Sequence, residues 1–310
     1  MKFLIIFIYT LKLHLLKSQM NHYIDKTKEK TEIPLPLNFD ARIKWPNCID
    51  TIKNQKSCGA CYAISASSSF SMRYCIRNNL TNIINFSSQH LINCLSGCKG
   101  EFPDIVWTYL NEKGIPKEEC EPYKNKQDKC LRNTCDNNKN NKVKYYKSGK
   151  IKFLENEYDI KKEIMLNGPV QSMFIVYKDY FDYKNGIYSH KYGNDIIDYH
   201  GVVIIGWGEE NGIKYWIIKN SLGENFGDKG YFKMKIGDDS GIGQTAFCDD
   251  VYNIDNNNYD NNNGDEDNNV IISNLNENKG NSSRNQSIYL YFRFFNYISI
   301  VMKIFFKYCN

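Results

Sequence analysis

The sequence contains no concentrated stretch of positive charge. Its 310 residues carry a formal net charge of only +5, and 35 acidic residues are spread among the basic ones. Proteins that bind nucleic acid usually cluster lysine and arginine on one face or along one helix. The composition therefore argues against a nucleic-acid partner.

Long uninterrupted apolar runs are also missing at the N-terminus. Residues 1–17 have a basic start and continue as FLIIFIYTLKLHLL, but Lys12 and His14 interrupt this run. A membrane-spanning helix needs about 20 apolar residues, whereas a short apolar run after a basic start is typical of a signal peptide. We therefore expect a signal peptide over 1–17 and a short pro-segment over 18–34.

Large apolar residues are scarce from 254 to 287, where Asn, Asp, Ser and Gly dominate. Such a segment cannot bury enough surface to fold, so a disordered linker is expected there. Residues 288–310 are apolar again, but Arg293, Asn296 and Lys303 would be costly at the centre of a bilayer. A membrane contact through this tail is conceivable but not expected, and the role of the tail stays open.

The cysteines lack the paired spacing of a zinc site, although there are eleven of them. This number exceeds what a reducing cytosol usually tolerates. Together with the leader, it indicates the secretory pathway, with a lysosome-like or digestive vacuole or the extracellular space as the destination. We expect no metal ion and no organic cofactor.

Residues 35–253 are compact in composition and rich in aromatic residues, so they form the catalytic candidate. The segment 60–77 has apolar and small residues at helical spacing, and no Gly or Pro interrupts it. The runs 201–208, 214–220 and 230–237 are β-branched or aromatic and are separated by Gly and Asn, which favours strands and turns. The pattern predicts an α+β protein with a helical first half and a β-rich second half.

One cysteine, Cys61, stands at the start of the predicted helix, in the run Cys58-Gly59-Ala60-Cys61. A helix N-terminus favours the thiolate, which is the form that attacks a carbonyl carbon. The same run also fits a redox C-x-x-C motif, so a disulfide oxidoreductase is an alternative on this motif alone.

A nucleophilic thiol needs a base, and imidazole has a suitable pKa. Among five histidines, His200 alone stands directly before an apolar, strand-like run. Asn220 follows the next strand-like run and offers an amide to orient the imidazole. The other histidines lie in the leader, the polar segment or ordinary amphipathic and turn contexts: His14, His22, His90 and His190.

These residues match the pattern C-G-[SA]-C-[WY] with His and Asn roughly 130–150 residues downstream, so the chain resembles the papain family of cysteine peptidases. The resemblance spans about 35 to 250, and LPLNFDAR with WPNC is similar to the mature start of cathepsin B. It implies a papain-like fold with a helical subdomain, a β-barrel-like subdomain and an active-site cleft between them. It also implies peptide or protein substrates and cystatin-like inhibitors as partners.

The same resemblance assigns roles to residues. Cys61 would be the nucleophile, His200 its base and Asn220 the orienting group, while Gln55 and the backbone N–H of Cys61 would form an oxyanion hole. The implied disulfides are Cys48–Cys75, Cys58–Cys98, Cys94–Cys130 and Cys120–Cys135.

Cathepsin C is a competitor within the family, because Cys61-Tyr62 and Phe102-Pro103 also resemble it. The Cys48 and Cys75 pair favours cathepsin B. Cathepsin C also depends on an extra N-terminal domain, and residues 18–34 are too short to form one.

The chain departs from cathepsin B at several positions. The region Cys120 to Cys135 is short and contains no histidine, whereas the occluding loop of cathepsin B carries two, so endopeptidase action is expected. The substrate-facing wall has Gly100-Glu101 instead of paired glycines. Cathepsin B has an acidic residue at the base of its specificity pocket, whereas the matching stretch 240–246, which includes the expected binding residue Thr245, has none, and this favours an apolar P2 side chain.

Leu222 and Phe226 replace family tryptophans, and we expect Leu222 to leave the His–Asn hydrogen bond more open to water. Such losses also permit a different class of protein, a catalytically silent papain-like binding protein. The retained Cys61 argues against that class, since silent relatives usually lose the nucleophile.

Overall fold

The computed structural model describes residues 32–132, 135, 143–193 and 195–249. The chain divides into a unit of residues 1–253 and a second unit of residues 254–310, and only the first contains described residues. The expected signal peptide, linker and tail lie outside the described residues, as does nearly all of the expected pro-segment.

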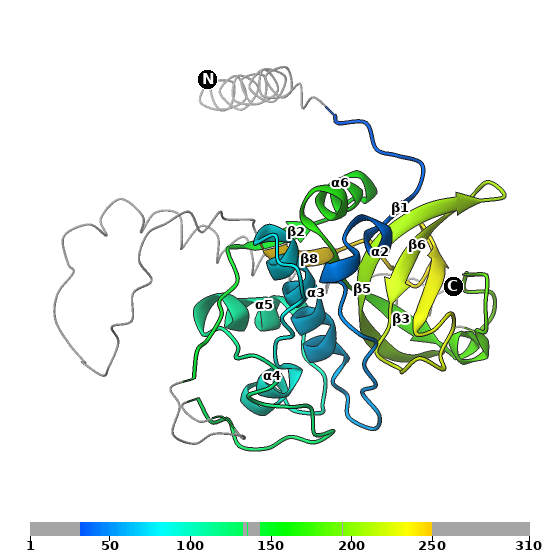
Figure 1. The fold of residues 1–310 in the computed structure, drawn as a ribbon. Helices are drawn as coiled ribbons and strands as arrows, with labels where there is room; N and C mark the ends of the chain where they lie inside the picture. Colours follow the sequence, from blue (N-terminus) through cyan, green and yellow to red (C-terminus); the bar gives the residue numbers. More distant parts are fainter. Residues whose placement is uncertain (1–31, 133–134, 136–142, 194, 250–310) are drawn as a thin grey trace, which may run out of the picture. The chain divides into compact units, whose positions relative to one another are not determined.

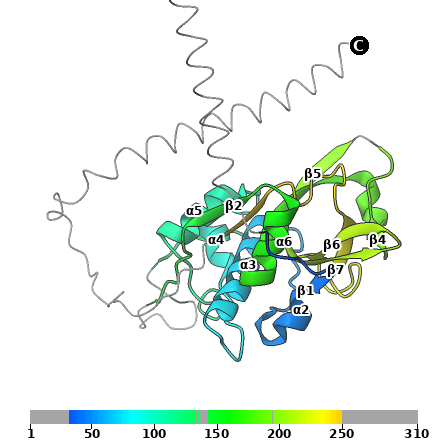
Figure 2. The same cartoon turned by 90° about the horizontal axis from the view of Figure 1, so that it is seen from above.

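The N-terminal half is mainly helical and is built around α3. This helix spans Cys61–Arg77, and it contacts the shorter helices α4 (Ser88–Cys94) and α5 (Pro103–Glu112) as well as strand β5 (Ile196–Glu210) (Figures 1 and 2). The remaining elements of this half are β1 (Phe39–Asp40), α2 (Ala41–Lys44), η1 (Pro46–Cys48), α4 (Ser88–Cys94) and α5 (Pro103–Glu112). The predicted helix over 60–77 therefore begins at the proposed nucleophile.

Small side chains allow α3 to be buried along most of its length. Its buried serines find partners for their hydroxyls. Within the helix, Ser65 donates to the carbonyl of Cys61 at 2.6 Å and Ser71 donates to that of Ser67 at 2.7 Å. Outside it, Ser68 donates to Asp50 at 2.8 Å and Ser69 to the Pro169 carbonyl at 2.9 Å. A buried hydroxyl without a partner would destabilise the fold, so these bonds make a serine-rich central helix possible.

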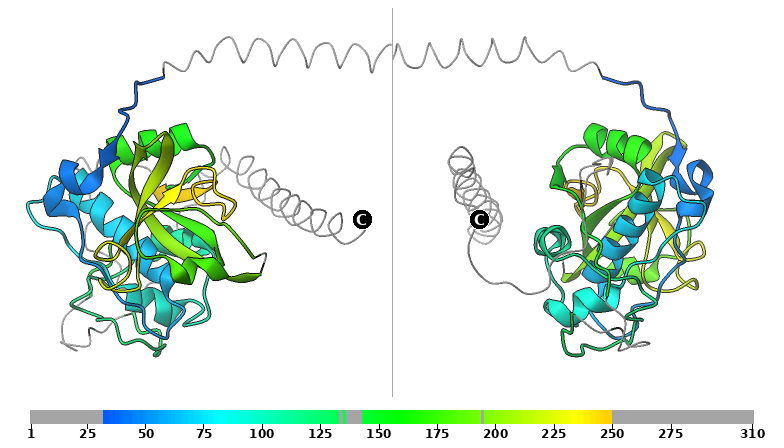
Figure 3. Two further views of the ribbon diagram at one scale, coloured as in Figure 1. Left: turned by 90° about the vertical axis from the view of Figure 1, so that its right-hand side faces the viewer. Right: turned by 60° about the vertical axis from the view of Figure 1, so that its left-hand side comes forward.

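The C-terminal half is a twisted sheet with the strand order β2-β8-β3-β5-β6-β7-β4 (Figure 3). Strand β1 pairs with β5 near its C-terminal end, at Gly206 and Trp207. Among the described strands only β4 and β7 run parallel. The strands are β2 (Ile151–Leu154), β3 (Val170–Tyr177), β4 (Ile187–Tyr188), β5 (Ile196–Glu210), β6 (Ile213–Lys219), β7 (Tyr231–Lys235) and β8 (Ala246–Asp249). Helix α6 (Glu157–Asn167) and the 3-10 helix η2 (Lys178–Asp182) complete this half.

Each half has its own hydrophobic core. Phe70, Phe86 and Trp107 are central in the helical half, and Trp207 and Trp216 are central in the sheet half. The architecture is the mixed α+β fold that the sequence predicts, although α6 adds a helix to the β-rich half.

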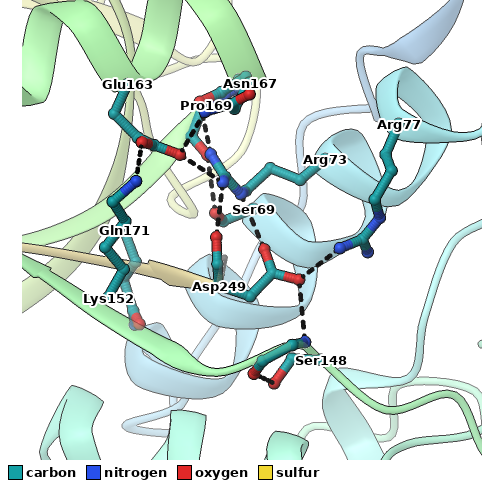
Figure 4. Close-up of polar contacts among 12 residues, drawn as sticks. Ser69, Arg73, Arg77, Ser148, Lys152, Glu163, Asn167, Pro169, Gln171 and Asp249 are labelled. Atoms are coloured by element: carbon teal, nitrogen blue, oxygen red, sulfur yellow. Dashed lines mark hydrogen bonds and ion pairs between the residues drawn. The ribbon is translucent and has the colours of Figure 1, made fainter. Parts of the chain in front are cut away.

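A buried ionic cluster fastens the C-terminal end of α3 to α6 and β8 (Figure 4). Arg73 contacts Glu163 at 2.7 Å and Asp249 at 2.9 Å, Arg77 contacts Asp249 at 3.0 Å, and Lys152 contacts Glu163 at 2.7 Å. Burial alone would raise the pKa of both carboxyl groups, but the charges and hydrogen bonds of these cations lower the pKa of Glu163 and of Asp249 below their usual values.

Candidate active site

The segment before α3 is fixed so that Cys61 begins the helix. The Cys58–Cys98 disulfide and the hydrogen bond from Gly59 N to the Cys98 carbonyl, at 3.2 Å, tie this segment to the neighbouring loop. A Cβ at Gly59 would lie 2.5 Å from the Cys98 oxygen, so only glycine fits there. The position of the thiol at the helix N-terminus thus depends on Cys58 and Gly59 and on their contacts with Cys98.

Two described cysteines are free, and their environments differ. Cys61 is half-buried, whereas Cys248 is fully buried. Burial raises the pKa of Cys248 to about 12, so this side chain stays a thiol. Cys61 is the described free cysteine that can act as a nucleophile.

His200 comes to Cys61 from the opposite half, on β5, close enough that each side chain shifts the pKa of the other. The next residue allows the approach: a Cβ at Gly201 would lie 3.3 Å from the carbonyl carbon and oxygen of Cys61 and 3.1 Å from Ser65 Oγ. A larger residue at position 201 would push β5 away from α3.

The two partners shift each other's protonation. Burial raises the pKa of the Cys61 thiol, but the hydrogen bond and charge of His200 and the backbone N–H groups of Gly201 and Tyr62 lower it by more. Burial lowers the pKa of His200, but Cys61 and Asn220 raise it by more. The cysteine pKa is therefore below its ordinary value and the histidine pKa above, which favours a thiolate–imidazolium pair.

The amide of Asn220 is oriented by its surroundings. Ser221 N donates to Asn220 Oδ1 at 2.8 Å, and a backbone N–H can only donate, so this atom must be the oxygen. His200 Nε2 lies 2.8 Å from the same oxygen and must therefore carry the hydrogen that it donates. The other ring nitrogen, Nδ1, is left for the thiol, which is the tautomer that a cysteine base requires.

Gln55 is held by both halves of the protein. Its Oε1 accepts a hydrogen bond from Ser221 Oγ at 2.6 Å, and its Nε2 donates to the Cys58 carbonyl at 3.3 Å. Tyr123 donates to its backbone carbonyl at 2.6 Å. One Nε2 hydrogen is thereby left for another acceptor, which fits the expected role in an oxyanion hole.

The expectation that Leu222 leaves the His–Asn bond open to water is wrong. Asn220 is 2% exposed and His200 is 8% exposed. Phe174 lies edge-on to the imidazole at 5.7 Å between ring centroids, and Tyr180 covers the amide. Aromatic side chains from β3 and η2 exclude the water that Leu222 does not, and nothing in their spacing along the sequence indicated this.

The other expected substrate-binding residues lie on loops around this centre. Gly100 lies beside Gly59, with its nitrogen 3.6 Å from the Cβ position there, and its φ of +83° is one that glycine adopts readily. Glu101 follows, and its carboxylate accepts a hydrogen bond from Phe102 N at 2.9 Å. Thr245 precedes β8, and its carbonyl accepts from Ser172 on β3 at 2.8 Å.

The described cysteines form four disulfides in the pairs that the family resemblance implies: Cys48–Cys75, Cys58–Cys98, Cys94–Cys130 and Cys120–Cys135. Because Cys58 pairs with Cys98, it is not available to Cys61 as a redox partner. No cluster of His, Cys, Asp or Glu in the described ranges could hold a metal ion.

Comparison with known proteins agrees with this geometry. The sequence model of the papain family of cysteine proteases matches residues 35–249, and the chain therefore belongs to that family. It is 35% identical over 241 residues to a cathepsin B-like cysteine proteinase of Schistosoma japonicum, covering 67% of this chain and 70% of that protein. It is 32% identical over 240 residues to cathepsin B-like cysteine proteinase 4 of Caenorhabditis elegans, covering 66% and 71%.

A solved structure of procathepsin B S9 from Trypanosoma congolense matches with a TM-score of 0.66 and 34% identity, covering 72% of this chain and 80% of that one. The chain is thus a cysteine peptidase, for which proteins are the substrates. Its disulfides and its cathepsin-like relatives indicate the secretory pathway. No helix within the part of the chain that the structure describes is long and apolar enough to cross a membrane.

Proposed function

We propose that this protein is a cysteine endopeptidase that acts through Cys61, His200 and Asn220. The observation that carries the proposal is the sequence of interacting groups from the thiol through the imidazole to the oriented amide, in which the pKa of the thiol is lowered and that of the imidazole is raised. Such a chain activates a thiol at mildly acidic pH, where an ordinary cysteine is protonated.

The reaction follows from this arrangement. The Cys61 thiolate attacks the carbonyl carbon of the peptide bond, and the resulting oxyanion receives hydrogen bonds from Gln55 Nε2 and the free backbone N–H of Cys61 at the helix start. The His200 imidazolium gives its proton to the leaving amine as the C–N bond breaks, which leaves a thioester.

Hydrolysis of the thioester reverses these roles. His200 takes a proton from water, the hydroxide attacks the acyl carbon, and the C–S bond breaks to return the thiolate and release a carboxylic acid. Every step uses groups of this chain and water.

Endopeptidase action rests on the absence of histidine from residues 120–135. Peptides with a free or an amidated C-terminus, monitored by mass spectrometry, test it. Internal cleavage of both is expected. Release of dipeptides from free C-termini, with the amidated peptides left intact, would instead mean carboxydipeptidase action.

An apolar P2 side chain is the preference that Thr245 supports, because threonine lacks the negative charge that would attract a basic residue. Glu101 adds one negative charge near the wall at Gly100 and favours basic side chains elsewhere in the peptide. A positional peptide library, read for the wild type and for Glu101→Gln, separates the two contributions.

The expected setting is a lysosome-like or digestive compartment or the extracellular space, and cystatin-like proteins are the expected inhibitors. A membrane contact through residues 288–310 is not part of the proposal. The pairing of a lowered thiol pKa with a raised imidazole pKa supports an acidic working environment.

The second candidate is a silent papain-like binding protein, a class that the replacements at Glu101, Leu222 and Phe226 permit. Intact-mass labelling with an epoxysuccinyl affinity probe at pH about 5.5, with Cys61→Ala as control, decides between them. Stoichiometric labelling that the control loses supports the peptidase. Folded protein that takes up no probe supports the binding protein.

A further inference from the structure

Tyr180 lies at the centre of the aromatic cluster behind the catalytic pair. It belongs to η2, which directly follows β3, and it is 1% exposed. Its ring lies 5.1 Å from that of Phe174, which itself lies against His200, and 5.4 Å from that of Phe226. A phenylalanine would fill the same space, so packing alone does not account for the hydroxyl.

That hydroxyl has a specific partner. Asn220 Nδ2 donates to Tyr180 Oη at 3.1 Å inside the protein. Because Ser221 N fixes Oδ1 on the other side of the amide, Nδ2 must point at Tyr180, and the tyrosine oxygen must accept. Burial raises the pKa of Tyr180 well above its ordinary value, so the hydroxyl stays neutral throughout the working pH range.

Loss of this acceptor would affect the catalytic pair through the amide. A buried Nδ2 without a partner is costly, and rotation of the amide relieves that cost only by turning Oδ1 away from His200 Nε2. The hydrogen bond that His200 Nε2 donates to Asn220 Oδ1 is one of the interactions that raise the pKa of His200. If the His200–Asn220 bond is weaker, the pKa of His200 is lower, and the thiolate–imidazolium pair then persists only to a lower pH.

We propose that Tyr180 is a positioning residue, whose hydroxyl holds the Asn220 amide in the orientation that supports His200. The inference rests on the proposed function, since it concerns the same site. Leu222 gives the inference weight, because its aliphatic side chain offers the amide no hydrogen bond, whereas Tyr180 Oη accepts one from Nδ2.

The experiment compares Tyr180→Phe with Tyr183→Phe in the full chain. Tyr183 belongs to the same aromatic cluster, with its ring 5.9 Å from that of Phe226, but its hydroxyl donates to the exposed carbonyl of Gly186 at 2.8 Å. The first readout is the rate of Cys61 alkylation by iodoacetamide against pH, which needs no peptide hydrolysis. The second is kcat and KM on a peptide substrate.

Loss of the imidazolium changes the alkylation rate on the alkaline side of the profile. For Tyr180→Phe we expect the midpoint of this alkaline limb to lie about half a unit to one unit lower in pH than in the wild type. We also expect kcat to fall about three- to tenfold with KM unchanged. Tyr183→Phe should match the wild type in both readouts. An alkaline limb that does not move in Tyr180→Phe would overturn the inference, whether or not the wild type cleaves peptides.

A double-mutant cycle tests the route of the effect. In an Asn220→Ala background the hydroxyl has nothing to hold, so Tyr180→Phe should then leave the alkylation profile unchanged. An equal shift with and without Asn220 would show that Tyr180 acts on His200 directly or through packing, and would also overturn the inference. If the wild type does not hydrolyse peptides but the alkylation profiles are as expected, the proposed function is contradicted and the inference about Tyr180 stands.

Discussion

At the scale of single residues, Ser221 joins two parts of the site. Its backbone N–H fixes the oxygen of Asn220, and its hydroxyl donates to Gln55 Oε1. The groups expected to orient the base and to hold the oxyanion therefore meet at one residue. Mutation can separate the contribution of the backbone N–H of Ser221 from that of its hydroxyl, because Ser221→Ala removes only the hydroxyl.

Ser221→Ala should lower kcat about three- to tenfold, since Gln55 loses the bond that fixes its amide. The pH limits of the reaction should not move, because the backbone N–H to Asn220 remains. Kinetics across pH measure both quantities. Ser189→Ala, which removes a hydroxyl bonded to Asp238, is the matched control and should be near wild type. A shifted alkaline limb in Ser221→Ala would contradict this division of roles.

The pH dependence of Cys61 reactivity follows from the pKa directions. As pH falls below the lowered cysteine pKa the thiolate is protonated, and as pH rises above the raised histidine pKa the imidazolium is lost. The alkylation rate should therefore show a plateau from mildly acidic to neutral pH, with the ion pair as the reacting species. His200→Ala should instead give one transition near the ordinary cysteine pKa of about 8.5.

At the scale of elements, the sequence predicts α3, β5, β6 and β7 well, because long periodic or β-branched runs with clear turn residues define them. It does not predict α6, β3 or β8. The strand β8 is only four residues long, and β3 follows α6 with a single Gly-Pro turn, so neither stands out in sequence. Tyr180 is missed for a different reason: its partner, Asn220, is distant in sequence and no motif links them.

The Arg73 cluster should contribute strongly to stability, because removing one member leaves a buried charge without its partner. Asp249→Asn should lower the free energy of unfolding by about 3–5 kcal/mol at pH 6, measured by urea denaturation. Lys233→Met, which breaks the exposed pair with Glu210, is the control and should cost under about 1 kcal/mol.

The same cluster predicts the pH range of that stability. The folded pKa values of Asp249 and Glu163 are lowered, so their contribution is fully present above the unfolded values of about 4 and is lost as pH falls through the folded values. Stability should hold from pH 7 to pH 5, and the gap between wild type and Asp249→Asn should close only below about pH 4. A gap that closes between pH 7 and 5 would contradict the assignment.

At the scale of the whole molecule, covalent reinforcement is uneven. Every described disulfide joins residues between 48 and 135, in the helical half. The sheet half relies on its hydrophobic core and on contacts such as the buried pair of Lys219 with Asp50 at 3.3 Å. Ser68 on α3 donates to the same carboxylate at 2.8 Å, so this pair also joins the two halves.

Strong reductant should therefore loosen the helical half first. Hydrogen exchange in the presence of excess dithiothreitol should rise in α4 and in the loops between Cys94 and Cys130, while β5 and β6 stay protected. Exchange in the oxidised protein is the reference. A simultaneous rise in both halves would mean that the disulfides stabilise the molecule as one cooperative unit.

The division of the site between the two halves has a consequence for the life of the chain in the cell. During synthesis the residues of α3 emerge well before those of β5, so the nascent helical half carries a thiol but no base. On the proposed mechanism, hydrolysis requires the completed sheet to pack against α3 and bring His200 to Cys61. On the same mechanism, the nascent helical half, which lacks His200, would be unable to hydrolyse the chain still bound to the ribosome.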